Sequence, residues 1–194
     1  MKIVIIKYNA GNIQSVLFAL ERIGIYATVT ANHEEIISAD KIIFPGVGEA
    51  NSAMNSLKEN NLNYVIQSLK QPVLGICVGM QLLCKYSEEN NTECLGIFDE
   101  PVKKFDSDIF KVPQIGWNNI YNLQSPLLNG INENSYCYFV HSYYVPLNKH
   151  TIATANYVQP YAAAICKNNF YGVQFHAEKS AHVGEQILKN FIQL

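Results

Sequence analysis

The first half of the chain alternates short apolar runs with longer amphipathic stretches, and this alternation limits the fold more than any other feature. The runs are typical of buried strands, and the stretches between them carry apolar residues at helical spacing. Strands that alternate with helices form parallel sheets, because a helix must return the chain before the next strand begins. The expected strands span residues 2–7, 27–30, 41–44 and 73–76.

The second half has a different pattern, with strand-like runs separated by turns, before the chain closes with an amphipathic helix. No linker, repeat or low-complexity tract divides the chain, so residues 1–194 are expected to form a single α/β domain. Its sheet should be open and mostly parallel, flanked by helices, with additional antiparallel strands. These later strands are expected over residues 101–105, 119–121, 136–144, 151–157 and 162–166.

Asparagine and glycine mark the expected helix ends. The first helix, about residues 12–23, should end at Gly24, and a second should have Asn32 as its N-cap with Glu35 three residues later. The stretch from residue 50 to 70 predicts either one broken helix or two short ones, interrupted at the pair of asparagines at 60 and 61.

Residues 72–81 contain the most informative motif, a cysteine between two glycines at the end of an apolar run. Gly75 and Gly79 stand two residues before and two after Cys77, and they permit a tight strand-to-helix turn with the thiol at its apex. A helix that begins at Val78 would direct free N–H groups at the sulfur and favour the thiolate. The motif predicts a nucleophile, and a buried structural cysteine is the competing interpretation.

A histidine and a glutamate near the C-terminus provide the partners that such a nucleophile needs. His176 and Glu178 stand two residues apart after an apolar segment. On an extended chain, residues at this spacing point to the same side, so the carboxylate can hold the imidazole in the tautomer that offers a free nitrogen to Cys77. The two segments together predict a Cys-His-Glu triad at the carboxyl edge of the sheet.

Several segments resemble, in the same order, the signatures of the class I (triad) glutamine amidotransferases. Residues 75–81 read Gly-Ile-Cys-Val-Gly-Met-Gln, and residues 174–180 read Gln-Phe-His-Ala-Glu-Lys-Ser. The segments at 8–16, 44–48, 112–118 and 138–144 resemble, within that family, the glutaminase subunits of imidazole glycerol phosphate synthase. The resemblance implies a flavodoxin-like fold and hydrolysis of glutamine to glutamate and ammonia through a thioester on Cys77.

The expected geometry of the turns predicts donors for the oxyanion, and the resemblance assigns residues to the substrate. The N–H of Val78 and a second donor from the turn at Val47 and Gly48 would bind the oxyanion. The α-amino and α-carboxylate ends of glutamine would be held by four residues, Gln81, His141, Ser142 and Tyr143. The competing interpretation of the turn at Val47 and Gly48 is an ordinary tight turn. For Gln81 it is a residue on a helix surface, and for His141 and Ser142 it is a strand edge.

Free ammonia would be lost as ammonium at neutral pH, so the resemblance implies a partner that receives it. In this family the partner is a cyclase subunit with the fold of a (β/α)8 barrel, and the heterodimer makes imidazole glycerol phosphate for histidine biosynthesis. Trp117 would anchor the interface, with Asn12, Asn118 and Lys179 near the same face, and a buried core tryptophan is the competing interpretation. No cofactor is implied.

Composition narrows the function classes without identifying one. Charged residues make up 15% of the chain, below the roughly 25% of average soluble domains, and the formal net charge is −2. Because no basic stripe is present, nucleic-acid binding has no electrostatic support. No run approaches the ~20 apolar residues of a membrane span, and a cytoplasmic location is expected.

The cysteine count argues against disulfide and zinc frameworks. Five cysteines without close pairs are most simply free thiols in a reducing compartment. The His-x-Glu pair could suggest a zinc deaminase, but that signature needs a following Pro-Cys-x-x-Cys, and none is present.

Two positions depart from the family pattern. Ala177 stands where proline commonly separates the histidine and the glutamate, and Lys7 stands where aspartate is usual. Alanine should loosen the segment without removing a chemical group, so activity is expected to survive.

Other functions stay open. Anthranilate synthase and related amidotransferases tend to carry histidine at the position of Met80. A cysteine peptidase or γ-glutamyl hydrolase of similar fold would act without a partner, and a non-catalytic binding subunit is disfavoured by the intact triad. The sequence leaves the ammonia acceptor open.

Overall fold

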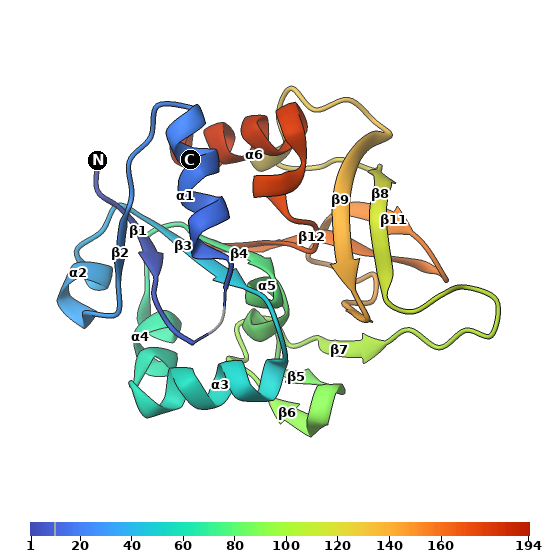
Figure 1. The fold of residues 1–194 in the computed structure, drawn as a ribbon, viewed down its shortest axis with the longest axis horizontal. Coiled ribbons are helices and arrows are strands. Elements are labelled where there is room, and N and C mark those ends of the chain that lie inside the picture. The colour runs from blue at the N-terminus through green and yellow to red at the C-terminus, as the bar shows by residue number, and fades with distance from the viewer. Residues whose placement is uncertain (10) are drawn as a thin grey trace.

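A seven-stranded sheet forms the centre of the computed structural model, which describes residues 1–9 and 11–194 (Figure 1). The strand order is β11, β12, β13, β4, β3, β1, β2, and the five strands from β13 to β2 are parallel. The antiparallel strands β11 and β12 extend one edge. This sheet confirms the expected fold class. Its strands are β1 (Ile3–Ile6), β2 (Thr28–Thr30), β3 (Lys41–Gly46), β4 (Val73–Cys77), β11 (Thr151–Asn156), β12 (Pro160–Lys167) and β13 (Phe170–Val173).

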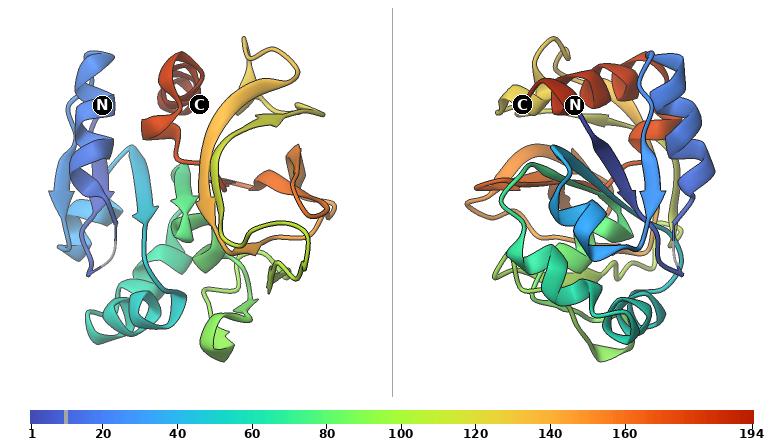
Figure 2. Two further views of the ribbon diagram at one scale, coloured as in Figure 1. Left: turned by 45° about the vertical axis from the view of Figure 1, so that its right-hand side comes forward. Right: turned by 90° about the vertical axis from the view of Figure 1, so that its left-hand side faces the viewer.

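Helices cover both faces of this sheet (Figures 1 and 2). One face carries α1 (Ile13–Arg22) and α6 (Ala181–Gln193), which contact each other. The other face carries α2 (His33–Ile37), α3 (Ala50–Glu59), α4 (Leu62–Ser68) and α5 (Val78–Leu83). Because both faces are covered, strands such as β1 and β4 are buried along their whole length, which explains why they are apolar without alternation.

The expected helix ends are present. The side chain of Asn12 accepts a hydrogen bond from the Ser15 N–H at the start of α1, and Asn32 caps α2 by accepting from the Glu35 N–H. Gly24 follows α1 with a φ of 77°, a conformation that favours glycine. The break between α3 and α4 falls at Asn61, which adopts the left-handed conformation. The segment of residues 8–16 includes Ala10, which lies outside the described residues.

The second half adds a two-stranded ribbon, β8 (Gln114–Ile120) and β9 (Ser135–His141). A small sheet lies beside it, formed by β10 (Tyr143–Tyr144), β7 (Pro101–Lys104), β5 (Tyr86–Ser87) and β6 (Thr92–Glu93). The described residues also form the 3-10 turns η1 (Glu89–Asn91), η2 (Pro126–Leu128) and η3 (Ala177–Lys179).

Two strand predictions in this half were wrong in their extent. A single strand was expected over 136–144, but the chain leaves β9 at Ser142 and joins a different sheet as β10, because β9 pairs with β8 and β10 pairs with β7. A strand was expected over 119–121, but β8 begins at Gln114. Gly116, Asn118 and Asn119 of β8 favour a turn locally, but pairing with β9 overrides that local preference.

The parallel strands bring the predicted site together at their carboxyl ends. β3 ends at Gly46, β4 ends at Cys77, and β13 leads through two buried residues to His176. Neighbouring parallel strands end at the same edge, so segments about a hundred residues apart in sequence meet there. Among the described residues, no helix is long and apolar enough to cross a membrane.

Candidate active site

Cys77 lies at the apex of a tight strand-to-helix turn. Its backbone has φ 53° and ψ −111°, and α5 begins at the next residue. A non-glycine residue in such a conformation costs about 1–3 kcal/mol, and strain of this size is concentrated at functional sites. A Cβ on Gly79 would lie 2.0 Å from the carbonyl oxygen of Phe44, and one on Gly75 would lie 2.8 Å from the Met80 nitrogen. Glycine at both positions therefore lets β3, β4 and α5 pack closely enough to form the turn.

His176 and Glu178 form a buried pair. The His176 Nδ1 and the Glu178 Oε1 are 2.7 Å apart. An extended chain was expected here, and this expectation was wrong, because residues 177–179 form the 3-10 turn η3. The turn folds the carboxylate back toward the imidazole, so the pair forms by a different route from the one expected.

The surroundings of His176 favour its charged form. Burial would lower its pKa, but hydrogen bonds to Cys77 and Glu178, together with the charges of both partners, outweigh burial and raise the pKa to about 10. An imidazole with this pKa is protonated at neutral pH. A neighbouring imidazolium favours the thiolate form of a cysteine, which is the nucleophilic form.

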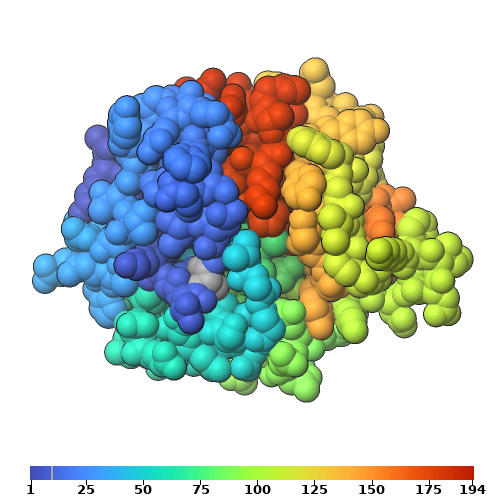
Figure 3. Space-filling model, in the orientation of Figure 1, coloured from blue at the N-terminus to red at the C-terminus, as the bar shows by residue number. Residues whose placement is uncertain are grey.

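A pocket of about 330 Å³ opens beside Cys77. The space-filling view shows a hollow on this face between the turn after β3, in cyan, and β9, in orange (Figure 3). The pocket wall includes Cys77 and His176 and also the residues predicted for the oxyanion, for substrate binding and for part of the interface: Val47, Gly48, Val78, Gln81, His141, Ser142, Tyr143 and Lys179. Among the described residues, no cluster of histidine, cysteine, aspartate and glutamate could hold a metal ion.

Gln81 is buried, so the competing interpretation of a helix surface residue was wrong. Its Nε2 donates to the Tyr143 carbonyl at 2.9 Å and to the Gln174 Oε1 at 3.0 Å. Both N–H groups of its amide are therefore used inside the protein. The side chain can present only its oxygen, an acceptor, to a molecule in the pocket.

His141 also lines the pocket, and its charge state is opposite to that of His176. Its Nδ1–H donates to the Tyr143 carbonyl at 2.8 Å, and its Nε2 lies 3.3 Å from the Tyr161 hydroxyl. Burial, with a smaller contribution from the charge of His176, lowers the pKa of His141 to about 4, although the bond to Tyr143 opposes this. His141 is therefore neutral at physiological pH.

The turn that follows β3 is fixed by a residue that the sequence argument did not identify. The Tyr8 hydroxyl is buried and donates to the Pro45 carbonyl at 2.6 Å, just before the turn at Val47 and Gly48. Gly48 has a φ of 92°, which favours glycine. Tyr8 thus ties the end of β1 to the turn expected to supply an oxyanion donor.

Glu89 is a second residue that the sequence argument missed. It lines the pocket, and its Oε2 accepts a hydrogen bond from the Ala50 N–H at 2.8 Å. Burial raises the pKa of Glu89. Glu89 lies in η1, between the two-residue strands β5 and β6, where no apolar run or periodicity gave a signal that could have found it.

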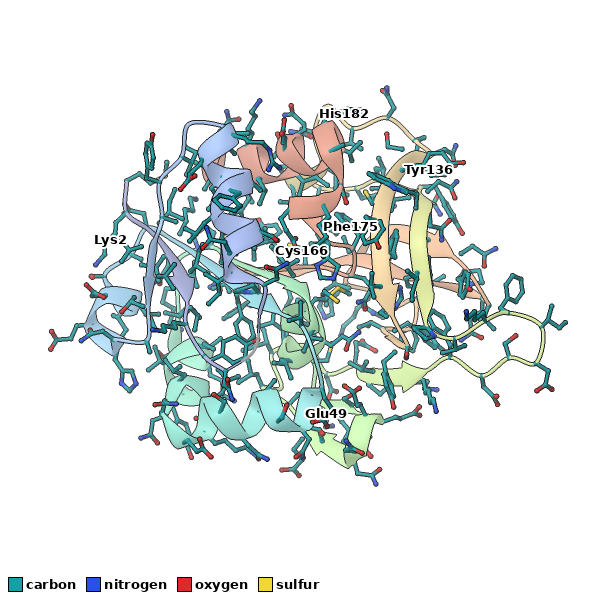
Figure 4. All side chains as sticks on the ribbon, in the orientation of Figure 1. Lys2, Glu49, Tyr136, Cys166, Phe175 and His182 are labelled. Atoms are coloured by element: carbon teal, nitrogen blue, oxygen red, sulfur yellow. The ribbon has the colours of Figure 1, made fainter. Side chains whose placement is uncertain are left out.

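The outward side of the β8–β9 ribbon is apolar and exposed. Trp117 is 54% exposed, and Ile115 and Tyr136 are more exposed still, so the interpretation of Trp117 as a buried core residue was wrong. The Trp117 ring packs edge-on against Tyr138, its partner in the ladder, and Tyr136 projects from the same side of the ribbon (Figure 4). We call this surface the ribbon face: Ile115, Trp117, Asn119, Tyr136, Tyr138 and Val140.

The other predicted interface residues lie in different surroundings. Asn118 points to the opposite side of β8 from Trp117, because side chains alternate along a strand, and its amide donates to the Asn156 carbonyl. Asn12 caps α1, which contacts η3, and Lys179 at the end of η3 lines the pocket. Lys179 and Val140 of the ribbon face thus line the pocket, Trp117 lies farther along the same ribbon face, and Asn118 points to the other side of the ribbon.

Comparisons with known proteins give a consistent result. The model of the family described as "Glutamine amidotransferase class-I" matches residues 4–194. The chain is 54% identical to the imidazole glycerol phosphate synthase subunit HisH of Bacteroides fragilis, over 100% of both chains. It is 49% identical to the corresponding subunit of Blochmanniella floridana over 100% of both chains, and 46% identical to that of Haemophilus influenzae over 100% of this chain and 98% of the relative.

Solved structures share the fold at low sequence identity. A putative GMP synthase protein from Thermoplasma acidophilum has a TM-score of 0.76 at 18% identity, over 100% of this chain and 93% of that one. A structure described as a glutamine amidotransferase also has a TM-score of 0.76, at 14% identity, over 100% of this chain and 98% of that one. At these identities the likeness concerns the fold alone.

Proposed function

Because the chain belongs to the class I glutamine amidotransferase family, we propose that it is the glutaminase subunit of an imidazole glycerol phosphate synthase. The observation that carries this proposal is 54% identity to such a subunit over the full length of both chains. The geometry supports the chemistry, since Cys77 and His176 line one pocket and Glu178 holds the imidazole. Residues 1–194 act as a single amidotransferase domain.

In the proposed mechanism, the Cys77 thiolate attacks the side-chain amide carbon of glutamine and forms a tetrahedral oxyanion. Protonated His176 gives its proton to the amide nitrogen, and ammonia leaves as the thioester forms. His176, now neutral, takes a proton from water, which hydrolyses the thioester to glutamate and regenerates the thiolate. Glu178 keeps the imidazole oriented through both steps.

The oxyanion is bound by backbone donors on either side of the sulfur. The N–H of Val78 lies immediately after the nucleophile at the start of α5, and a second donor comes from the turn at Val47 and Gly48. Loss of one such donor typically raises a barrier by ~3 kcal/mol. The Tyr8 bond to Pro45 supports the orientation of this turn.

The α-ammonium group of glutamine is held by acceptors. The Gln81 oxygen is the free part of its amide, and the Glu89 carboxylate adds a negative charge to the same pocket. Ser142 supplies a hydroxyl for the α-carboxylate. His141 stays neutral, and it and the Tyr143 carbonyl hold Gln81 and the pocket wall in place.

We propose that the partner is a cyclase subunit with the fold of a (β/α)8 barrel, which docks on the ribbon face to form a heterodimer and receives the ammonia. Trp117 is the aromatic anchor, and Lys179 and the α1 end at Asn12 contribute beside it. No cofactor takes part. The proposed location is the cytoplasm, where a catalytic thiol stays reduced.

The test is glutamate release from glutamine, measured with the purified chain alone and with a cyclase subunit that carries its nucleotide substrate. We expect slow release alone, strong stimulation by the liganded cyclase, and none by the Cys77→Ala variant. Full activity without a partner would indicate an independent hydrolase. No response to the cyclase would indicate another ammonia acceptor.

A further inference from the structure

Gln174 lies between the Cys77 sulfur and the side-chain amide of Gln81. It follows β13 and is fully buried. Its side-chain Oε1 accepts from the Gln81 Nε2 at 3.0 Å, and its Nε2 lies 3.8 Å from the Cys77 Sγ. A fully buried carboxamide therefore lies behind the pocket wall, in contact with two residues that line the pocket, Cys77 and Gln81.

The direction of this carboxamide follows from its neighbours. The Gln81 nitrogen donates to the Tyr143 carbonyl, which can only accept, so the Gln81 nitrogen and oxygen cannot be exchanged. The atom of Gln174 that faces this nitrogen must then be an acceptor, which is its oxygen. The nitrogen of Gln174 consequently faces the sulfur with an N–H donor.

A fixed donor at this position distinguishes the thiolate from the thiol. The thiol S–H can donate to the Val140 carbonyl, which lies 3.8 Å from the Cys77 Sγ. When the proton leaves, that carbonyl loses its partner and faces a negative charge. Gln174 and His176 are the side chains among the described residues that then donate to the sulfur. A hydrogen bond to the charged form of a group favours that form.

We propose that Gln174 is a further catalytic residue, a carboxamide donor that stabilises the Cys77 thiolate and keeps its sulfur aimed into the pocket. The proposal rests on the proposed role of Cys77 as the nucleophile. It also gives Gln81 a second task, because its N–H fixes the orientation of Gln174.

The variant Gln174→Glu provides the sharpest test. Glutamate is nearly isosteric and keeps an oxygen for Gln81, but it replaces the donor that faces the sulfur with a carboxylate oxygen. Gln174→Met removes the donor without adding charge. Gln67→Glu is the matched control, because it also removes a side-chain donor, to the Leu95 carbonyl, at a distance from the pocket.

The measurement is the rate of Cys77 alkylation by iodoacetamide as a function of pH, followed by mass spectrometry of the Cys77 peptide in the full chain. We expect Gln174→Glu to move the midpoint upward by about one to two pH units, which is about 10- to 100-fold slower alkylation below the midpoint. Gln174→Met should move it upward by less, and Gln67→Glu should leave it unchanged.

An unchanged midpoint in Gln174→Met, with native near-ultraviolet circular dichroism, would overturn the proposal even if glutamine hydrolysis fell. If Gln174→Glu does not fold, the methionine variant decides alone. Alkylation needs neither glutamine nor a partner, so this result is independent of whether the wild-type chain proves to be a partner-stimulated glutaminase.

Discussion

At the scale of single residues, two histidines of one pocket are driven to opposite charge states. His176 has a carboxylate and a thiol as partners, and its pKa is raised to about 10. His141 has a carbonyl as the acceptor for its N–H, and burial lowers its pKa to about 4. The same side chain is therefore protonated at neutral pH in one place and is a neutral hydrogen-bond donor in the other.

This contrast predicts an acid-sensitive step in stability. His141 binds a proton near pH 6.5 in the unfolded chain but only near pH 4 in the folded one, so its contribution is intact above 6.5 and is lost as the pH falls toward 4. Between pH 7 and pH 5 the loss should be about 2 kcal/mol. Urea unfolding of the wild type and of His141→Gln, each at pH 7 and at pH 5, measures this loss in the free energy of unfolding. Equal pH dependence in the two proteins would contradict the prediction.

At the scale of elements, the sequence predicts the parallel half well and the antiparallel half poorly. Strands such as β1 and β4 are continuous apolar runs, and caps such as Asn32 act locally, so a short window contains their signal. The division of residues 136–144 into β9 and β10 depends on which distant strand each part meets, and no local pattern contains that.

The candidate site divides in the same way. Cys77 and His176 lie in short motifs at strand ends, where sequence alone indicates chemistry. Glu89, Tyr8 and Gln174 enter the site through contacts with segments 37 or more residues away, and although the quoted motifs include Tyr8 and Gln174, only the folded chain shows these contacts.

The close packing at the turn between β4 and α5 predicts that Gly79 is important for stability. In Gly79→Ala the new Cβ would lie 2.0 Å from the Phe44 carbonyl oxygen, so β3 and α5 must separate. We expect a loss of several kcal/mol in the free energy of unfolding, or failure to fold. Gly96→Ala is the control, since Gly96 has φ 68° but open space around it, and it should cost about 1 kcal/mol. Thermal and urea unfolding compare the two, and similar losses would show that close packing at the turn is not required.

At the scale of the whole molecule, the β8–β9 ribbon has one side that faces inward, toward the protein, and one side that faces outward. The inward side of β9 includes His141 on the pocket wall, and its outward side belongs to the ribbon face. The helices α3 and α4 cover the face of the central sheet that is opposite to α1 and α6 (Figure 2). The ribbon face contributes Val140 to the pocket wall, whereas α4 contributes none of the residues that line the pocket.

Substitution of Trp117 tests whether this ribbon binds the partner. If Trp117 is the proposed aromatic anchor, Trp117→Ala should weaken binding to the proposed cyclase partner by about 2 kcal/mol or more, roughly 30-fold in Kd. The free energy of unfolding should change by only about 0.5 kcal/mol, since the side chain is half exposed. Titration calorimetry measures the affinity, and Tyr64→Ala, an exposed tyrosine on α4, is the control. Equal affinities for the two variants would place the interface elsewhere.

The alternation of β9 also has a consequence for how such chains can change during evolution. Residues 137, 139 and 141 face inward, and the residues between them face outward. Deletion of one residue of β9 before His141 would exchange the inward and outward positions on one side of the deletion, and His141 would lose its contacts with the Tyr143 carbonyl and the Tyr161 hydroxyl. Although β9 lies near the surface, where length changes are usually tolerated, its length should be as invariant among functional descendants as that of a core strand.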